Sequence, residues 1–305
     1  MDSMNVTQAL DRQEWLGPVA DGLQTAMAKV YAPSGAAGQK VADFLHGVWL
    51  GHPLHPVLTD IPLGAWTAAA ALDLMEAVGG RTELGPGADA AVGVGLLGAL
   101  GAAASGLTDW YLLRANKSTQ RVGAAHAMLN VTATALYAAS WCLRRRGRRG
   151  TGQAVGWLGY GVVCAAAYLG GALVYEQKIG ADHATREGLP PDFVPALPDA
   201  ELPEDQPTRV EVNGVKVLLV RRNGRISALG ELCSHLGGPL ADGKLEGNCV
   251  ICPWHYSKFD LSSGEVVDGP ATFPQPCFET RVRDGQIEVR TPKIPQNEDH
   301  VSIHP

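Results

Sequence analysis

Charge and aromatic side chains are scarce in this chain of 305 residues: charged residues make up 18% of it and aromatic residues 6%. The formal net charge of −6 leaves no excess of positive charge, which excludes nucleic acid as a partner. Six cysteines are too few and too unevenly spaced for a disulfide scaffold. The N-terminus has no charged stretch followed by an apolar one and no twin-arginine pair, so we expect no cleavable export signal.

The scarcity of charge is concentrated in one half of the chain. Residues 57–175 are dominated by Ala, Gly, Leu and Val, whereas residues 184–292 carry charges throughout. Crossing a bilayer takes about 20 apolar residues. The segments of that length are 57–78, 88–113, 122–143 and 155–175. The sequence therefore predicts a membrane α-helical bundle of four transmembrane helices, with a buried soluble bundle as the alternative.

The regions around these segments complete the predicted membrane domain, residues 46–185. Residues 1–45 are predicted to be an amphipathic N-terminal region, which lies along the membrane surface or docks on the bundle. The basic run from Arg144 to Arg149 is typical of a loop that flanks a membrane span.

Ionisable residues gather at one end of the predicted bundle. Four crossings return the chain to its starting side, so these residues share a side with the C-terminal domain. They are His52, His55, Asp60, Asp109, His126 and His183. Such groups are costly at membrane depth and indicate a cofactor site or a satisfied polar network. Histidines from separate helices are candidate ligands of haem b or a metal ion, or proton relays for a quinone. The alternative is that His52 and His55 simply lie at the water interface.

Several short motifs in this half resemble a family of bacterial membrane domains of unknown function. They are HPLHPVLTDIPLGAW, SGLTDW, AHAMLN and ADH, spread over about residues 45–185. The resemblance implies an integral membrane protein of the bacterial inner membrane with a four-helix membrane domain. It implies no established activity.

A proline-rich segment separates the two halves. Residues 186–206 and their neighbours include GLPPDFVPALPDAELPEDQP, a composition that predicts a semi-rigid extended linker. Residues 207–292 then alternate short strands with Asn213-Gly214, Asn223-Gly224 and Asp284-Gly285, which favour tight hairpins. This pattern predicts a small all-β sandwich or barrel, followed by a C-terminal tail over residues 293–305.

Two loops of the predicted β domain each contain a cysteine followed closely by a histidine. The four residues are Cys233, His235, Cys252 and His255. Soft thiolates suit iron with bridging sulfide, and two imidazoles on the second iron are distinctive. Zinc is the alternative, although zinc fingers pair cysteine with cysteine and histidine with histidine. Gly237 and Pro239 suit the tight loops that such a site needs. Residues 205–292 therefore resemble the Rieske [2Fe–2S] domain family.

The resemblance also implies a redox class. In the high-potential type of respiratory cytochrome bc complexes, each ligand loop has an extra cysteine, and here Gly238 and Trp254 stand at those positions. Two hydroxyls raise the potential in that type, and here Ser257 stands at one position and Phe259 at the other. Fewer hydrogen bonds to the sulfurs imply a low to middle potential. We expect Trp254 to shield the cluster and both histidine ligands to keep one edge near solvent.

The two halves together predict a membrane-anchored Rieske electron-transfer protein. It exchanges electrons with a redox partner protein or a quinone, through a haem, metal or quinone site at the histidine-rich end of its membrane domain. The alternative is a ferredoxin-like or oxygenase component anchored to the membrane. A complete Rieske oxygenase needs a mononuclear iron in a large further domain, so we expect an electron carrier or oxidoreductase component. With no export signal, the Rieske domain is expected in the cytoplasm.

Overall fold

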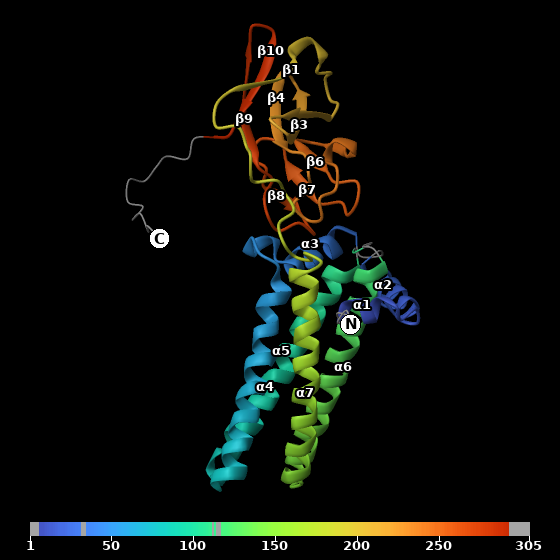
Figure 1. Cartoon of the computed structure of the whole chain (residues 1–305), viewed down its shortest axis with the longest axis vertical. Helices are drawn as coiled ribbons and strands as arrows, with labels where there is room; N and C mark the ends of the chain where they lie inside the picture. Colours follow the sequence, from blue (N-terminus) through green and yellow to red (C-terminus); the bar gives the residue numbers. More distant parts are fainter. Residues whose placement is uncertain (1–5, 32–34, 112, 114–116, 293–305) are drawn as a thin grey trace, which may run out of the picture. The chain divides into compact units, whose positions relative to one another are not determined.

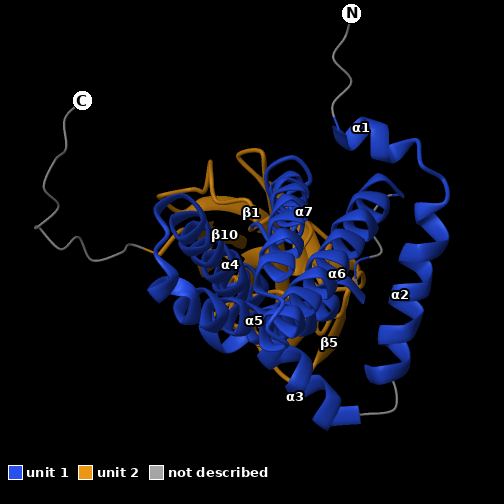
Figure 2. Ribbon diagram, turned by 90° about the horizontal axis from the view of Figure 1, so that it is seen from below, with its two compact units in different colours: residues 1–181 blue, residues 182–305 orange. Residues whose placement is uncertain are grey.

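The structure, a computed structural model, describes residues 6–31, 35–111, 113 and 117–292. It divides into two compact units, Met1–Ala181 and Asp182–Pro305, each described here by itself (Figures 1 and 2). The first unit is helical and the second is built from strands. The tail predicted over 293–305 lies outside the described residues.

Four long helices form the body of the first unit, and Figure 2 shows them nearly end-on. They are α4 (Leu54–Gly79), α5 (Gly85–Tyr111), α6 (Lys117–Arg145) and α7 (Arg149–Tyr175). Among the described residues, α4, α7 and the segment Thr82–Tyr111, which contains α5, are long and apolar enough to cross a membrane. The prediction of four transmembrane helices is thus supported for three.

Helix α6 has the length of a membrane span but carries more polar side chains. Several of them bond to the backbone of their own helix one turn earlier: Asn130 to His126, Thr132 to Met128 and Thr134 to Asn130. Such back-bonding satisfies the polar groups locally. The polar composition of α6 therefore lowers its hydropathy without leaving these side chains unpaired.

Helices α4 and α6 face each other with a constant offset in residue number. Asp73 and Arg144, which form a buried ion pair, are 71 positions apart. The stacked rings of Trp66 and Tyr137, with centroids 4.1 Å apart, have the same offset (137 − 66). So do the rings of His55 and His126, whose centroids are 6.4 Å apart (126 − 55).

The buried positions of helices α5 and α7 correspond to each other at a constant offset of 64 residues. The buried residues Ala88, Val92, Gly95, Ala102, Ser105 and Thr108 of α5 correspond to Gly152, Gly156, Gly159, Ala166, Leu169 and Ala172 of α7, which are also buried. The hairpins α4–α5 and α6–α7 are therefore structural repeats in parallel orientation, as in membrane proteins built from two equivalent halves.

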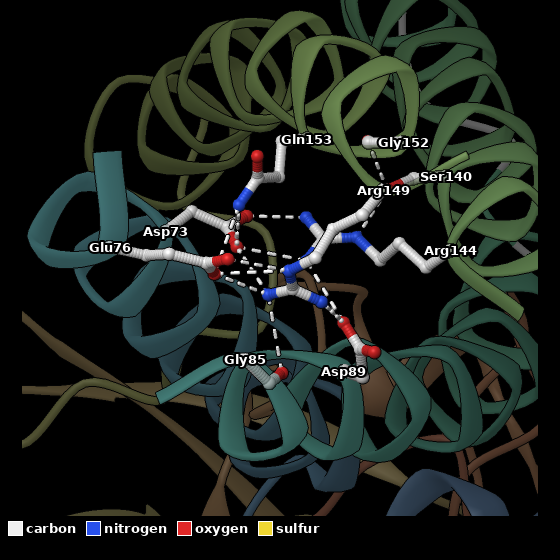
Figure 3. A network of polar contacts seen from close by, with 9 residues as sticks. All are labelled: Asp73, Glu76, Gly85, Asp89, Ser140, Arg144, Arg149, Gly152 and Gln153. Carbon is white, nitrogen blue, oxygen red and sulfur yellow. Dashed lines mark hydrogen bonds and ion pairs between the residues drawn. The ribbon is translucent and has the colours of Figure 1, made fainter. Parts of the chain in front are cut away.

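A polar network joins all four helices near the loop between α6 and α7 (Figure 3). Arg144 is 6% exposed and donates to both carboxylate oxygens of Asp73 and, at 3.1 Å, to Asp89. Arg149 donates to Glu76 and, at 2.6 Å, to Asp89. The predicted basic loop is confirmed for residues 146–148, but Arg144 and Arg149 lie in α6 and α7, where carboxylates of α4 and α5 neutralise them.

Three shorter helices lie beside the long ones. They are α1 (Val6–Asp11), α2 (Leu16–Tyr31) and α3 (Gly35–His46). Leu16 and Ala20 of α2 are buried in a cluster with Val122 and Leu169. This part of the amphipathic N-terminal region therefore docks on the bundle, the second of the two alternatives.

The second unit contains two antiparallel sheets. The larger has the order β1-β10-β9-β4-β3-β2 and the smaller β5-β6-β7-β8. The strands are β1 (Val194–Pro198), β2 (Thr208–Val212), β3 (Val215–Arg222), β4 (Arg225–Gly230), β5 (Lys244–Glu246), β6 (Cys249–Ile251), β7 (Lys258–Asp260), β8 (Val266–Asp268), β9 (Cys277–Arg283) and β10 (Gln286–Arg290). The predicted hairpin turns at 213–214, 223–224 and 284–285 are confirmed, with positive φ at both residues of each.

Part of the predicted linker is a strand. Strand β1, within residues 186–206, pairs with β10 at the edge of the larger sheet, where prolines that cannot donate a hydrogen bond are tolerated. The ring of Phe193, just before it, packs against the guanidinium groups of Arg281 and Arg290, 4.0 and 4.3 Å from its centroid. These contacts explain why the segment joins the β unit rather than remaining a connector throughout.

The substitution Asp73→Asn tests whether the network holds the bundle together. It leaves the buried Arg144 without its main counter-charge, which costs about 3 kcal/mol. We expect a clearly lower Tm for the helical circular dichroism of the full chain in detergent. Glu83→Ala is the control, because Glu83 pairs with Arg81 on the surface and such pairs contribute at most about 1 kcal/mol. Equal effects of the two substitutions would contradict the role of the network.

Candidate metal centre

Two loops with the same hydrogen-bond pattern carry the predicted ligands. In the first ligand loop, residues 233–238, the Cys233 N–H donates to the Gly238 carbonyl at 2.8 Å, and the Gly237 N–H donates to the Cys233 carbonyl at 2.7 Å. In the second ligand loop, residues 252–257, the corresponding bonds join Cys252 and Ser257 at 2.8 Å, and Tyr256 and Cys252 at 3.1 Å. Each cysteine is therefore held by a closed turn that follows β4 or β6.

The two thiols are buried and point toward each other. Cys233 and Cys252 are each 1% exposed, and their side chains are hydrogen-bonded. This bond, helped by the backbone N–H groups of Trp254 and His255, lowers the pKa of Cys252 to about 7, and the same bond together with burial raises the pKa of Cys233. The backbone N–H groups therefore favour the thiolate form of the cysteines, which is the form that binds metals.

The imidazoles of the two ligand loops also meet. The ring centroids of His235 and His255 are 4.9 Å apart, with the planes at 90°. His235 is half-buried, but His255 is only 6% exposed. The expectation that both histidines reach solvent therefore holds for His235 alone, while Trp254, itself 52% exposed, lies with its ring 6.4 Å from that of His255.

This donor set fits a two-iron centre. Two thiols and two imidazoles are brought together, yet no three His, Cys, Asp or Glu side chains among the described residues surround one point closely enough to hold a single ion. A tetrahedral zinc ion would require all four ligands around one centre. In a Rieske cluster each iron takes only two protein ligands, so the arrangement favours that assignment.

A third segment, residues 271–276, ties the two ligand loops together. The Ala271 N–H donates to the Ser257 hydroxyl oxygen at 3.0 Å, and the Ser234 hydroxyl donates to the Phe273 carbonyl at 2.6 Å. Because the Ser257 oxygen accepts this bond, its own hydrogen remains to be donated. Phe259, at the other predicted hydroxyl position, is fully buried in the core beneath the loops.

Gly238 occupies a position with no room for a side chain. A Cβ atom there would lie 2.8 Å from the Cys252 sulfur and 3.2 Å from the Trp254 ring. The extra cysteine of the high-potential type therefore does not fit this loop as it is built. The neighbouring Pro239 forms a β-bridge with Leu232, which closes the first ligand loop.

The six candidate residues predicted for the membrane domain lie in several different places. His55 and His126 approach each other, whereas Asp109 pairs at 2.6 Å with His46, a residue that is 1% exposed. The exposed His52 has its ring 3.2 Å from the Pro53 carbonyl, and Asp60 is exposed. His183 belongs to the second unit, where its backbone N–H donates to the Ser234 carbonyl. A single site of all six predicted residues is not formed within the first unit.

The polar network of Figure 3 was not predicted as a unit. Its signal is present in the sequence: Asp73, Glu76 and Asp89 interrupt or adjoin apolar segments, where isolated carboxylates are costly. A basic run followed in the next helix by Gln153 supplies their partners. Pairing these charges required the tertiary arrangement.

Comparison with known families identifies both parts of the chain. Residues 192–279 match the Rieske [2Fe-2S] domain family, and residues 51–183 match a family described as predicted membrane protein (DUF2231). Both resemblances inferred from the sequence are confirmed. The Rieske match implies a [2Fe–2S] cluster.

Known proteins that are similar to this chain match its C-terminal part. The chain is 38% identical over 90 residues to the anthranilate 1,2-dioxygenase ferredoxin subunit of Burkholderia cepacia, spanning 29% of this chain and 82% of that protein. It is 37% identical over 93 residues to apoptosis-inducing factor 3 of Mus musculus, spanning 30% of this chain but only 15% of that protein. A solved ferredoxin of carbazole 1,9a-dioxygenase from Nocardioides aromaticivorans IC177 is 26% identical, covering 33% of this chain and 98% of that chain, with a TM-score of 0.32.

The two ligand loops differ in backbone strain, which gives a matched pair of substitutions. Gly237 and Tyr256 occupy equivalent positions with φ of 72° and 66°, and that region is unfavourable for side chains by about 1 kcal/mol or more. Gly237→Ala meets no neighbouring atom within 4 Å, so only this strain lowers stability. Tyr256→Gly relieves the strain and should stabilise the loop by a similar amount. The measurement is the temperature at which the full chain loses its visible iron–sulfur absorbance, and shifts in the same direction would contradict the assignment.

Proposed function

We propose, on the premise that this chain belongs to the Rieske [2Fe–2S] family through its C-terminal domain, that it is a membrane-anchored one-electron carrier. The observation that carries the proposal is the pair of equivalent loops, which present two buried thiols and two imidazoles at one place. A Rieske electron-transfer role is also supported by the relatives, which include ferredoxin components of dioxygenase systems.

Different residues of the site would bind the cluster, contact the redox partner and exclude water. When bound, the [2Fe–2S] cluster supplies one-electron oxidation and reduction. Cys233 and Cys252 would hold it as thiolates stabilised by backbone N–H groups, and His235 and His255 would hold it through imidazole nitrogens. His235 is the more accessible histidine, which makes it the contact point for a redox partner. Buried Ser257 and Phe259 keep water from the inner side.

The first unit is proposed to anchor this carrier in the bacterial inner membrane. Three helices have the length and hydropathy of membrane spans, and the family match is to predicted membrane proteins. Helix α6 is proposed as the fourth crossing, because it repeats α4 and its polar side chains are satisfied within the bundle. The domains are accordingly proposed as 46–185 for the membrane part and 207–292 for the Rieske part.

With four crossings, the start of α4 and the end of α7 would lie on one side, from which the chain would continue into the Rieske domain. We propose that this side is cytoplasmic. Lys117 and Arg121 at the start of α6 and Lys178 after α7 supply positive charge on it. The other end carries the basic residues around Arg144–Arg149, so the protease test below decides between the two orientations.

The electron partner is proposed to be a redox protein or a quinone, with a haem, metal or quinone site at the histidine-rich end of the membrane domain. A second candidate function is that of a ferredoxin component of an oxygenase system. It is favoured by the similarity to the anthranilate dioxygenase ferredoxin subunit, of which the chain covers 82%.

The reduction potential should lie in the lower part of the Rieske range of about −150 to +300 mV. The second-loop positions offer one hydroxyl, Ser257, where the high-potential type has two. An EPR-monitored redox titration of the full chain measures the potential, and a value above about +200 mV would contradict the proposal. Ser257→Ala should lower it further by about 40 mV, the equivalent of one hydrogen bond of about 1 kcal/mol. Ser263→Ala, on an exposed turn, is the control.

Inverted and right-side-out membrane vesicles test the carrier function directly. Bacterial membranes that contain the full chain are supplied with a quinol or with reduced ferredoxin reductase, and the Rieske EPR signal is followed. Reduction by quinol supports a quinone as the electron partner. Reduction by the reductase alone supports the second candidate function, a ferredoxin component of an oxygenase system. Reduction by neither, or absence of the signal, would overturn the proposal. Protease cleavage after α7 only in inverted vesicles is expected for a cytoplasmic Rieske domain.

A further inference from the structure

His55 and His126 occupy equivalent positions in the two repeated hairpins. Each lies on the first helix of its hairpin, and the two ring centroids lie 6.4 Å apart across the repeat, with the ring planes nearly perpendicular at 88°. The same register brings together Trp66 with Tyr137 in the next part of the core. The repeat therefore places one imidazole from each half at the same depth of the bundle.

Both imidazoles are oriented by the same kind of bond. Nδ1 of His55 lies 2.8 Å from the Ala102 carbonyl, and Nδ1 of His126 lies 2.9 Å from the Ala166 carbonyl. A carbonyl only accepts, so Nδ1 carries the hydrogen in each ring and Nε2 carries the lone pair. Asn130 agrees with this at His126, because its amide donates to Nε2 at 3.1 Å. This is how histidine ligands of metals are commonly oriented.

Each ring also packs against a glycine of its own hairpin. A Cβ atom on Gly106 would lie 2.7 Å from the His55 ring, and one on Gly170 would lie 3.1 Å from the His126 ring. Gly106 and Gly170 each stand four residues after the carbonyl that accepts from Nδ1. Both halves therefore use a carbonyl and a glycine one turn later to seat a histidine, a duplicated arrangement that a single structural histidine does not require.

The spacing and number of ligands select the class of cofactor. Two imidazoles bound through nitrogen on opposite sides of one metal, with bonds of about 2.0 Å, have ring centroids about 6.3 Å apart. A bare zinc or iron ion needs three or four protein ligands, but no group of three His, Cys, Asp or Glu in the described part of the chain can hold one. A haem iron takes four ligands from the porphyrin and needs only two axial ones.

We propose that His55 and His126 are the axial ligands of a haem b bound between the two hairpins of the membrane unit. The proposal rests on the proposed function, for which it names the redox group of the membrane domain. Iron at Nε2 of His126 replaces the bond from Asn130, whose amide keeps its bond to the His126 carbonyl at 2.9 Å. Ser105, with its hydroxyl 3.5 Å from Nδ1 of His55, remains on the side away from the iron.

The test is haem binding by the purified full chain, both as isolated and after titration with hemin. We expect one haem per chain in a pyridine haemochrome assay and a low-spin optical and EPR spectrum typical of two imidazole ligands. His55→Ala and His126→Ala should each reduce hemin affinity at least tenfold. His52→Ala is the matched control, because His52 is exposed at the same end of α4 and should leave binding unchanged.

His126→Met keeps the proposal testable if His126→Ala fails to fold. It offers a thioether in place of the imidazole, so haem should remain bound with the spectrum of mixed histidine and methionine ligation. The proposal is overturned if the native chain binds no haem under either condition, if His52→Ala loses haem as strongly as the other variants, or if His126→Met keeps the native spectrum. One bound metal per chain without porphyrin would also overturn it.

The Rieske EPR signal of the same samples separates this inference from the proposed function. A normal signal without haem overturns only the haem site. Loss of the signal in the native chain overturns the carrier function itself.

Discussion

The buried ion pair between Asp73 and Arg144 sets the register in which the two hairpins of the membrane unit meet. A guanidinium group this deeply buried is stable only with its carboxylate in place, so the two helices cannot slide past each other by a turn without leaving charges unpaired. The stack of Trp66 on Tyr137 and the approach of His55 to His126 follow at the same offset. One interaction at one end of the bundle thus determines which side chains face each other at the other end.

The two repeats pair different kinds of residue at their two ends. Near the loop between α6 and α7, equivalent positions carry opposite charges, Asp73 and Arg144, and these bind each other across the repeat. Near the start of α4 and α6, equivalent positions carry the same residue, His55 and His126, each seated by its own hairpin. Complementary charges join the two halves directly. Two identical imidazoles with lone pairs at corresponding nitrogens are instead suited to binding one further group between them.

In the β unit, equivalent side chains are brought together by two loops rather than by two helical hairpins. Cys233 and Cys252 each accept backbone N–H bonds within a closed turn, so thiolates are stabilised before any metal binds. The loops are not identical: the first places a glycine at the left-handed position and the second places Tyr256 there. The segment 271–276 bonds to both and fixes the distance between them.

Much of this protein follows from local sequence. The Cys-x-His and Cys-x-x-His spacing, the Asn-Gly and Asp-Gly turns and the long apolar segments each depend on a few neighbouring residues, so the ligand loops, the hairpins and three membrane helices were predictable. Partners distant in the chain were not predictable. They include the contact of Phe193 with Arg281, the pairing of Asp109 with His46, and the burial of Arg144 beside Asp73 within α6 rather than in a loop. Only the tertiary structure decided these, because the free energy of a buried charge or imidazole depends on which groups surround it, and those groups lie tens of residues away in the sequence.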